Sequence, residues 1–238
     1  MVPGRDLTDP LGKALLDSFT QDSLNPLQSY VSARGREAAV QEMESKRWGP
    51  TKIPIHNVLL PFLYTTTDKS FPLSVARYLA EDLAVPVNGT DVTGSSALYW
   101  AISAQPFTEP EFAQILFDAG GSVNQKNRFG CTAASEISQT TNGGMMKWFY
   151  EHGGNVDSKD HDGMTARGII DMRARQVPTL AQAIAQGRGT RQTSQCTTCG
   201  RRPLILNRCM RCGNASYCGQ ECQKADWKMH KRNCVAAA

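Results

Sequence analysis

The chain has 238 residues, of which 40% are hydrophobic and 20% are charged, a composition typical of a globular protein and not of a disordered one. No stretch approaches the roughly 18 consecutive apolar residues of a membrane span, and charges and a proline interrupt the opening MVPGRDLTDP where a signal peptide needs an apolar core. We therefore expect an intracellular protein, nuclear or cytoplasmic. The formal net charge of +4 is unevenly distributed along the chain, with +8 on residues 187–238 and −4 on residues 1–186.

Residues 1–47 contain two predicted helices. DPLGKALLDSF and NPLQSYVSARGREAAVQEMESKR each have a proline near their start, where a helix tolerates it because the N–H groups of the first turn have no partner within the helix. We predict that this N-terminal helical region covers the exposed apolar end of the repeats that follow.

Three segments in the middle of the chain align with one another: VPVNGTDVTGSSALYWAIS, GSVNQKNRFGCTAASEIS and GNVDSKDHDGMTARGIID. Their marker glycines, Gly94, Gly130 and Gly163, are 36 and then 33 residues apart. In each segment an Asn- or Asp-rich turn ends at the glycine, and a Ser or Thr suited to begin a helix precedes a short apolar helix. A second amphipathic helix precedes each turn, in SVARYLAEDLA, EFAQILFDAGG and MMKWFYEHGG.

These units resemble ankyrin repeats, which have this period. The family signature T-P-L-H-x-A has its nearest match in IPIHNV, residues 53–58, and degenerate matches in SALYWA, TAASEI and TARGII. Ile53 stands where the family has Thr, so the usual Thr–His hydrogen bond to His56 is not expected. The resemblance implies a mostly α-helical solenoid of about four repeats over residues 48–186. It also implies that turn tips contact a partner protein, with Val92, Thr93, Lys126, Arg128, Phe129, His161 and Asp162 as candidate contacts. The alternative is that these residues are ordinary solvated loops.

The segment TLAQAIAQ, residues 179–186, is expected to cap the last repeat. The polar residues GRGTRQTSQ, 187–195, follow it and have the composition of a linker. The sequence thus predicts a helical cap, a repeat region, a linker and a C-terminal module over residues 196–234.

Seven of the eight cysteines lie in that C-terminal module, in the pattern C-x2-C-x9-C-x2-C-x5-C-x3-C-x7-H-x3-C. In a reducing compartment such a cluster favours metal binding over disulfides. The seven thiols and His230 make eight soft or borderline ligands, the number that fills two tetrahedral zinc sites. We predict two structural zinc ions, with a disulfide knot or a redox C-x-x-C motif as the alternatives.

The same residues, and the wording YCGQECQKADWKMHKRNC in particular, resemble the MYND-type zinc finger over 196–234. The resemblance implies that the fold is a cross-brace and that the finger binds a proline-rich peptide of P-x-L-x-P or P-P-x-L-x character. It implies that the peptide lies against Gln223 and Trp227, with Met210 and Tyr217 completing the groove, whereas the alternative for Trp227 is packing within the small core. It also implies two interleaved ligand sets: Cys196, Cys199, Cys218 and Cys222 for one zinc ion, and Cys209, Cys212, His230 and Cys234 for the other.

The basic residues of the finger have two explanations. Seven thiolates and two zinc ions together carry a charge of about −3, which nearby Lys and Arg side chains partly balance. The alternative is a finger that contacts nucleic acid, although the predicted helix carries metal ligands and is not free to enter a groove.

Catalysis is not expected, because a catalytic zinc ion keeps an open position and all eight ligands here are used. MYND fingers also occur in SET-domain lysine methyltransferases, but no Asn-His-Ser-Cys stretch is found in the chain. A methyltransferase relative and a RING-type ubiquitin ligase therefore stay remote alternatives. Cys131 lies at a variable repeat position beside Gly130 and is expected to be a tolerated small residue and not a nucleophile. No acid and nucleophile partner is visible in the sequence for His56, His152 or His161.

The sequence as a whole predicts a non-enzymatic adaptor, in which the repeats bind one protein and the finger binds a proline-rich peptide on another. The second hypothesis is a nuclear regulator whose basic finger contacts nucleic acid.

Overall fold

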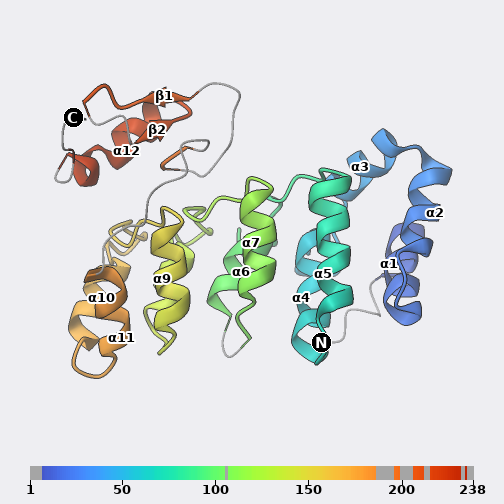
Figure 1. The fold of residues 1–238 in the computed structure, drawn as a ribbon, viewed down its shortest axis with the longest axis horizontal. Helices are drawn as coiled ribbons and strands as arrows, with labels where there is room; N and C mark the ends of the chain where they lie inside the picture. The colour runs from blue at the N-terminus through green and yellow to red at the C-terminus, as the bar shows by residue number, and fades with distance from the viewer. Residues whose placement is uncertain are drawn as a thin grey trace. The chain divides into compact units, whose positions relative to one another are not determined.

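The protein is described by a computed structural model that covers residues 7–104, 107–185, 196–198, 206–211, 215–231 and 234. It is mostly helical, with a two-stranded antiparallel sheet near the C-terminus (Figure 1). The predicted linker, residues 187–195, lies outside the described residues. None of the described helices has the length and apolar character needed to cross a bilayer. The chain divides into two compact units, residues 1–101 with 109–119, and residues 102–108 with 120–238.

The first unit begins with three helices, α1 (Pro10–Gln21), α2 (Asn25–Arg34) and α3 (Arg36–Ser45), where the sequence predicted two. The prediction is wrong because Gly35 has a φ of 82°, a left-handed conformation that ends one helix before the next begins. At the start of α1, Asp9 accepts hydrogen bonds from the backbone N–H of Gly12 (3.1 Å) and from the indole N–H of Trp48 (2.7 Å). The side chain of Asp9 therefore ties α1 to Trp48, at the start of the predicted repeat region.

The rest of the first unit consists of α4 (Ile55–Thr65), α5 (Ser70–Arg77), a π-helical turn (Tyr78–Asp82), the first residues of α6 (Ala97–Ser103), and α7 (Pro110–Asp118). Helix α5 packs against both α4 and α7. The apolar faces of these helices form a closed core, with no exposed surface on Leu59, Leu63, Val75, Leu79 and Phe112. Burial of such side chains is the main contribution to the stability of the unit.

The imidazole of His56 lies inside this core, where it is 2% exposed. Its Nε2 is 3.2 Å from the backbone oxygen of Val85, and its Nδ1 has no hydrogen-bond partner among the described residues. Burial lowers the pKa of His56 to about 4, so the ring is neutral at physiological pH.

The second unit contains α8 (Ala133–Ile137), α9 (Gly143–Glu151), α10 (Ala166–Arg173) and α11 (Pro178–Ala185). Helix α8 packs against α9 and α10. Helix α11 also packs against α9 and α10 (Figure 1). The glycines that follow α7 and α9, Gly120 and Gly153, have φ values of 94° and 84°, as expected of residues that end a helix. The apolar side chains between the helices include Ala134, Ile137, Met146, Phe149 and Leu180, all fully buried.

One turn occurs three times with the same geometry. Gly94, Gly130 and Gly163 have φ values of 79°, 79° and 80°, and each donates its N–H to the carbonyl oxygen three residues earlier. In each turn one side-chain oxygen accepts two backbone N–H groups: Asp91 from Thr93 and Ser95, Asn127 from Phe129 and Cys131, and Asp160 from Asp162 and Met164. The repeat period seen in the sequence is thus present in the structure as a repeated turn, whereas membership of the ankyrin family stays a prediction.

We predict that His56→Gln removes part of the acid sensitivity of the fold. The folded-state pKa of about 4 lies below the unfolded value of about 6.5, so the unfolded chain binds a proton first as the pH falls. The free energy of unfolding should therefore drop by up to about 3 kcal/mol between pH 6.5 and 4 because of this residue alone. Chemical denaturation at several pH values should show a shallower dependence in His56→Gln than in wild type. The exposed His161→Gln serves as the control, and equal slopes in His56→Gln and wild type would contradict the assignment.

Candidate metal centre

Three of the predicted ligands, Cys196, Cys218 and Cys222, lie together. Cys218 follows strand β2 (Ser216–Tyr217), and Cys222 lies in the first turn of helix α12 (Gln220–His230). The three Sγ atoms are all within 4.8 Å of one another, and those of Cys218 and Cys222 are 3.5 Å apart. The four-residue step from Cys218 to Cys222 brings both thiols to one side of the start of α12.

A second group consists of Cys209, His230 and Cys234. Cys209 follows strand β1 (Asn207–Arg208), and His230 is the last residue of α12. The Nε2 atom of His230 is 3.1 Å from the Sγ of Cys209, which is 3.7 Å from the Sγ of Cys234. The structure therefore brings six of the eight predicted ligands into two groups, in the same interleaved order that the resemblance implies. The other two, Cys199 and Cys212, lie outside the described residues.

The separations between these sulfur atoms distinguish a metal site from a disulfide. A disulfide joins two sulfurs at about 2.0 Å, whereas sulfurs about 2.3 Å from a tetrahedral zinc ion lie about 3.8 Å apart. The observed 3.5 and 3.7 Å fit the second value, and the described cysteines are all free thiols. Thiolate sulfur with one imidazole nitrogen is also the donor set that zinc prefers.

Short backbone contacts hold the ligand-bearing segments together. Strands β1 and β2 are antiparallel, with Asn207 opposite Tyr217 and Arg208 opposite Ser216. Just beyond this pair, Cys209 donates its N–H to the carbonyl oxygen of Ala215 at 2.8 Å. Strands β1 and β2 lie side by side (Figure 1). They thereby place Cys209 of one ligand group beside the segment that leads to Cys218 of the other.

Tyr217 occupies the interior of the finger and not its surface. Its side chain is 1% exposed, and its hydroxyl donates to the buried carboxylate of Asp226 at 2.9 Å. Its ring lies edge-on to the ring of His230, with 6.3 Å between centroids. The prediction that Tyr217 lines a peptide groove is therefore wrong, because the ring is needed to fill the small core beside the second ligand group.

The other predicted peptide contacts are at the surface. Trp227 is 49% exposed and Met210 is 100% exposed, and Gln223 is exposed as well. Gln223 and Trp227 are one helical turn apart on α12, so they share a face. Part of the indole lies toward the ligand His230, with 6.1 Å between ring centroids. The two readings of Trp227, peptide contact and packing, are thus both compatible with its half-exposed position.

The side chain of Asn124 joins the finger to the repeated turns of the second unit. Its Nδ2 donates to the carbonyl oxygens of Thr198 (2.6 Å) and Gly153 (3.0 Å), and its Oδ1 accepts the backbone N–H of Asn155 (2.7 Å). Thr198 follows the ligand Cys196 by two residues, and its hydroxyl donates to the carbonyl oxygen of Cys222 at 2.6 Å. Thr198 is therefore held by α12 on one side and by Asn124 on the other. The sequence analysis missed this residue, whose only local signal is its place before a repeated turn.

Most of the predicted repeat contacts are also at the surface. Phe129 is 51% exposed, with the guanidinium of Arg128 4.8 Å from its ring centroid, and Val92 is 41% exposed. Thr93 is half-buried. Its hydroxyl forms hydrogen bonds with the side chains of Asp91 and Ser95 and so stabilises its own turn. The remaining predicted contacts, Lys126, His161 and Asp162, are exposed.

Cys131 and His152 have structural surroundings. Burial and the carboxylate of Asp160 raise the pKa of the Cys131 thiol, whose Sγ is 3.9 Å from Asp160 Oδ2. A raised pKa disfavours the thiolate that a nucleophile requires. The ring of His152 stacks on Trp148, with 3.9 Å between centroids.

Comparison with known proteins identifies the C-terminal module. The family model of the MYND finger matches residues 196–234. N-lysine methyltransferase SMYD2 of Gallus gallus is 51% identical over 43 residues, and SET domain-containing protein 14 of Caenorhabditis elegans is 46% identical over 43 residues; each match covers 18% of this chain and 10% of the relative. The human N-lysine methyltransferase SMYD2 is 49% identical over 41 residues, 17% of this chain and 10% of the relative. The chain thus spans about a tenth of the length of these curated relatives, in the finger region. Residues 196–234 form a MYND zinc finger.

We predict that Asn124→Ala weakens the attachment of the finger to the second unit without lowering its zinc content. The change removes three hydrogen bonds, at an expected cost of about 1–3 kcal/mol. Hydrogen–deuterium exchange of the full chain should become faster at residues 153–155 and 196–198, while the zinc content stays as in wild type. Asn25→Ala, which removes an exposed amide on α2, is the matched control. Unchanged exchange in both segments would contradict this role for Asn124.

Proposed function

We propose that this protein is a non-enzymatic adaptor whose MYND finger binds a proline-rich peptide and whose repeat region binds a second protein. MYND fingers are protein-interaction modules, which supports this class of function. The observation that carries the proposal is the half-exposed indole of Trp227 on α12, a helix that also carries Cys222 and His230. A large aromatic surface on a helix fixed at both ends is a preorganised platform for a ligand.

The chemistry around Trp227 suits a proline-containing peptide. A proline ring is compact and apolar and packs on an indole, and an extended peptide has free backbone groups that a side-chain amide can bind. Gln223, one turn before Trp227, supplies such an amide. Strand β1 is exposed along both of its residues, and Met210 follows it at the surface. These features place apolar and hydrogen-bonding groups on the same small module.

In this proposal two zinc ions organise the finger. Cys196, Cys199, Cys218 and Cys222 would hold one ion, and Cys209, Cys212, His230 and Cys234 the other. Each ion, when bound, cross-links chain segments and neutralises part of the thiolate charge. The described core of the finger is small and three of its five buried members are ligands, Cys196, Cys209 and Cys234. Folding of the module is therefore expected to depend on metal.

The second binding surface of the proposal is formed by turn tips of the second unit. The N–H of His161 donates to the carbonyl oxygen of Phe129 at 3.1 Å, which joins two successive turns. Phe129 with Arg128 stacked over it is exposed on this joined surface. Aromatic and Arg side chains are frequent energetic centres of protein interfaces. The repeated turn and its exposed tips support an ankyrin-type protein contact here.

Nucleic-acid binding is the alternative reading of the finger, because Arg208, Arg211, Lys224 and Lys231 are exposed. Lys224 lies 3.2 Å from Glu221, which reduces its free charge. Binding to DNA or RNA with a steep dependence on salt would favour this alternative. Binding of S-adenosylmethionine by the full chain would overturn the proposal that the protein is not an enzyme.

We predict two zinc ions per chain by native mass spectrometry of the full chain. Cys222→Ser removes one thiolate from the first ligand group and disturbs α12, so the zinc content should fall to one or none. Cys131→Ser, outside the finger, is the matched control and should retain two ions. A wild-type stoichiometry below two would contradict the ligand assignment.

We also predict that Trp227→Ala weakens binding of a P-x-L-x-P peptide by at least about tenfold, which corresponds to about 1.4 kcal/mol, while zinc content is unchanged. Isothermal titration of the full chain measures the affinity, and metal analysis confirms that the finger is intact. Lys224→Ala, on the same helix, is expected to bind as wild type does. Equal affinities of Trp227→Ala and wild type would place the peptide elsewhere.

A further inference from the structure

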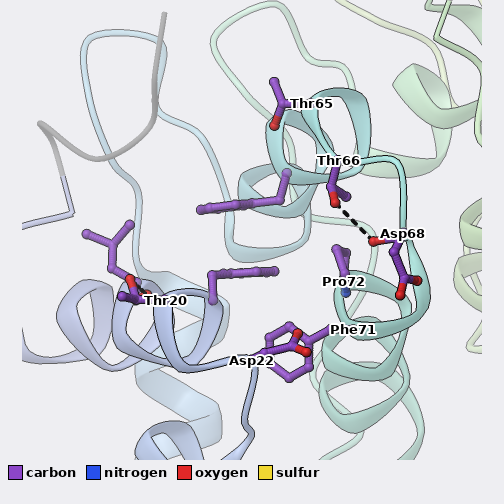
Figure 2. Close-up of a pocket in the computed structure, with 10 residues that line it drawn as sticks. Thr20, Asp22, Thr65, Thr66, Asp68, Phe71 and Pro72 are labelled. Carbon is purple, nitrogen blue, oxygen red and sulfur yellow. Dashed lines mark hydrogen bonds between the residues drawn. The ribbon is translucent and has the colours of Figure 1, made fainter.

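A cleft in the first unit has no role in the adaptor proposal. It lies where α1, α4 and α5 meet and has a volume of about 430 Å³, enough for one or two side chains of a ligand (Figure 2). One side of it is apolar, from Phe19, Phe62 and Phe71 together with Leu16 and Pro72. The rest of the lining is polar and includes two carboxylates, Asp22 and Asp68.

The three phenylalanine rings hold one another in place. Phe19 and Phe62 are stacked, with 3.8 Å between centroids and 4° between ring planes. Phe71 is edge-on to Phe19, with 5.6 Å between centroids and 83° between planes. All three rings are only partly buried, although three packed aromatic side chains from three helices would ordinarily be closed within a core. The cleft therefore has a rigid aromatic surface that faces solvent.

The charge at the rim of this cleft is negative. Asp22 and Asp68 are both exposed, and neither takes part in an ion pair within the described part of the chain. Hydrogen bonds from the backbone and side chain of Ser70 lower the pKa of Asp68, so this carboxylate is ionised at neutral pH. Lys69, the next residue, is paired instead with Glu109 at 2.5 Å.

The end of helix α1 adds to this negative potential. Asp22 is the residue at its C-terminal cap, where the carbonyl groups of the last turn carry a partial negative charge. The last turn of α1 contains no basic residue that would balance that charge. Figure 2 labels Asp22, Asp68 and Phe71 among the residues that line the cleft. The cleft thus combines aromatic faces with unpaired anionic groups.

We propose that this cleft binds the side chain of an arginine or lysine from an extended segment of a partner protein. The methylene groups of such a side chain would pack on the phenylalanine rings, and its cationic group would lie over an aromatic face and between the carboxylates of Asp22 and Asp68. Aromatic rings attract cations through their π electrons, and carboxylates add direct charge pairing. The occupant is therefore a basic peptide with an apolar residue next to its cation, a chemistry different from that of the proline-rich ligand of the finger.

The test compares wild type with Asp22→Asn/Asp68→Asn in the full chain. Both changes keep side-chain size, and Asn is well tolerated in the left-handed conformation of residue 22, whose φ is 49°. Display of random 12-residue peptides on the two proteins should enrich Arg or Lys beside an apolar residue on wild type and not on the double variant. Glu37→Gln, an exposed carboxylate on α3, is the control and should enrich the same peptides as wild type. Identical enrichment on wild type and the double variant would overturn the proposal.

The peptide most strongly enriched on wild type then supplies the quantitative test. Replacing its arginine by neutral citrulline, or its lysine by neutral acetyl-lysine, should weaken binding by at least about tenfold in wild type, and the loss should vanish in Asp22→Asn/Asp68→Asn. Phe71→Leu should weaken binding of the arginine peptide, while its thermal midpoint of unfolding should stay close to that of wild type. Equal affinity for the arginine and citrulline peptides would overturn the assignment.

Sedimentation of the full chain completes the test. Concentration-dependent dimers that the double variant abolishes would make a second copy of the chain the occupant of the cleft. That result would overturn the partner-peptide proposal.

Discussion

Coordination by cysteine and histidine is the interaction on which the finger depends, because the ligands themselves form most of its interior. The buried hydrophobic residues in the described part of the finger are Cys196, Cys209, Ala215, Tyr217 and Cys234, too few to offset the entropy of an ordered chain. Helix α12 carries both Cys222 and His230, which are eight residues and thus about 12 Å apart along the helix. It is the element shared by both ligand groups. The position of Trp227 between them is therefore set by coordination at both ends and only secondarily by packing.

The helical region obeys a different constraint, a closed turn held by one acceptor side chain. Asp91, Asn127 and Asp160 each accept two backbone N–H groups, and a glycine with φ near 80° completes each turn. The helices that follow, beginning SALYWA, TAASEI and TARGII, share little sequence with one another. The turn therefore preserves the period while the helices vary, since the helices need only an apolar face whereas the turn needs particular acceptors and a left-handed residue.

How much could be predicted from the sequence depended on how local each signal was. The ligand spacing and the turn glycines are local, and the structure groups six predicted ligands and repeats the turn. Burial is not local: Tyr217 was predicted as a surface contact and lies in the core, and the break at Gly35 was missed because its flanking residues are all compatible with one helix. The aromatic cleft had no sequence signal at all. Phe19, Phe62 and Phe71 come from three helices, and only their packing places them on one surface.

The two proposed peptide sites select by different physics, and this decides what a partner must contain. The finger offers an indole and a neutral amide, which favour a proline-rich segment whose binding is insensitive to salt. The cleft offers phenyl rings and carboxylates, which favour a basic segment whose binding weakens as salt increases. Each site is small, so neither alone is expected to bind tightly. A partner that carries both segments on one chain would bind with higher affinity, because after the first contact the second one forms within the same complex. A partner with only one segment would not have this advantage. Selectivity would then come from the pairing of two unlike segments and not from the strength of either site.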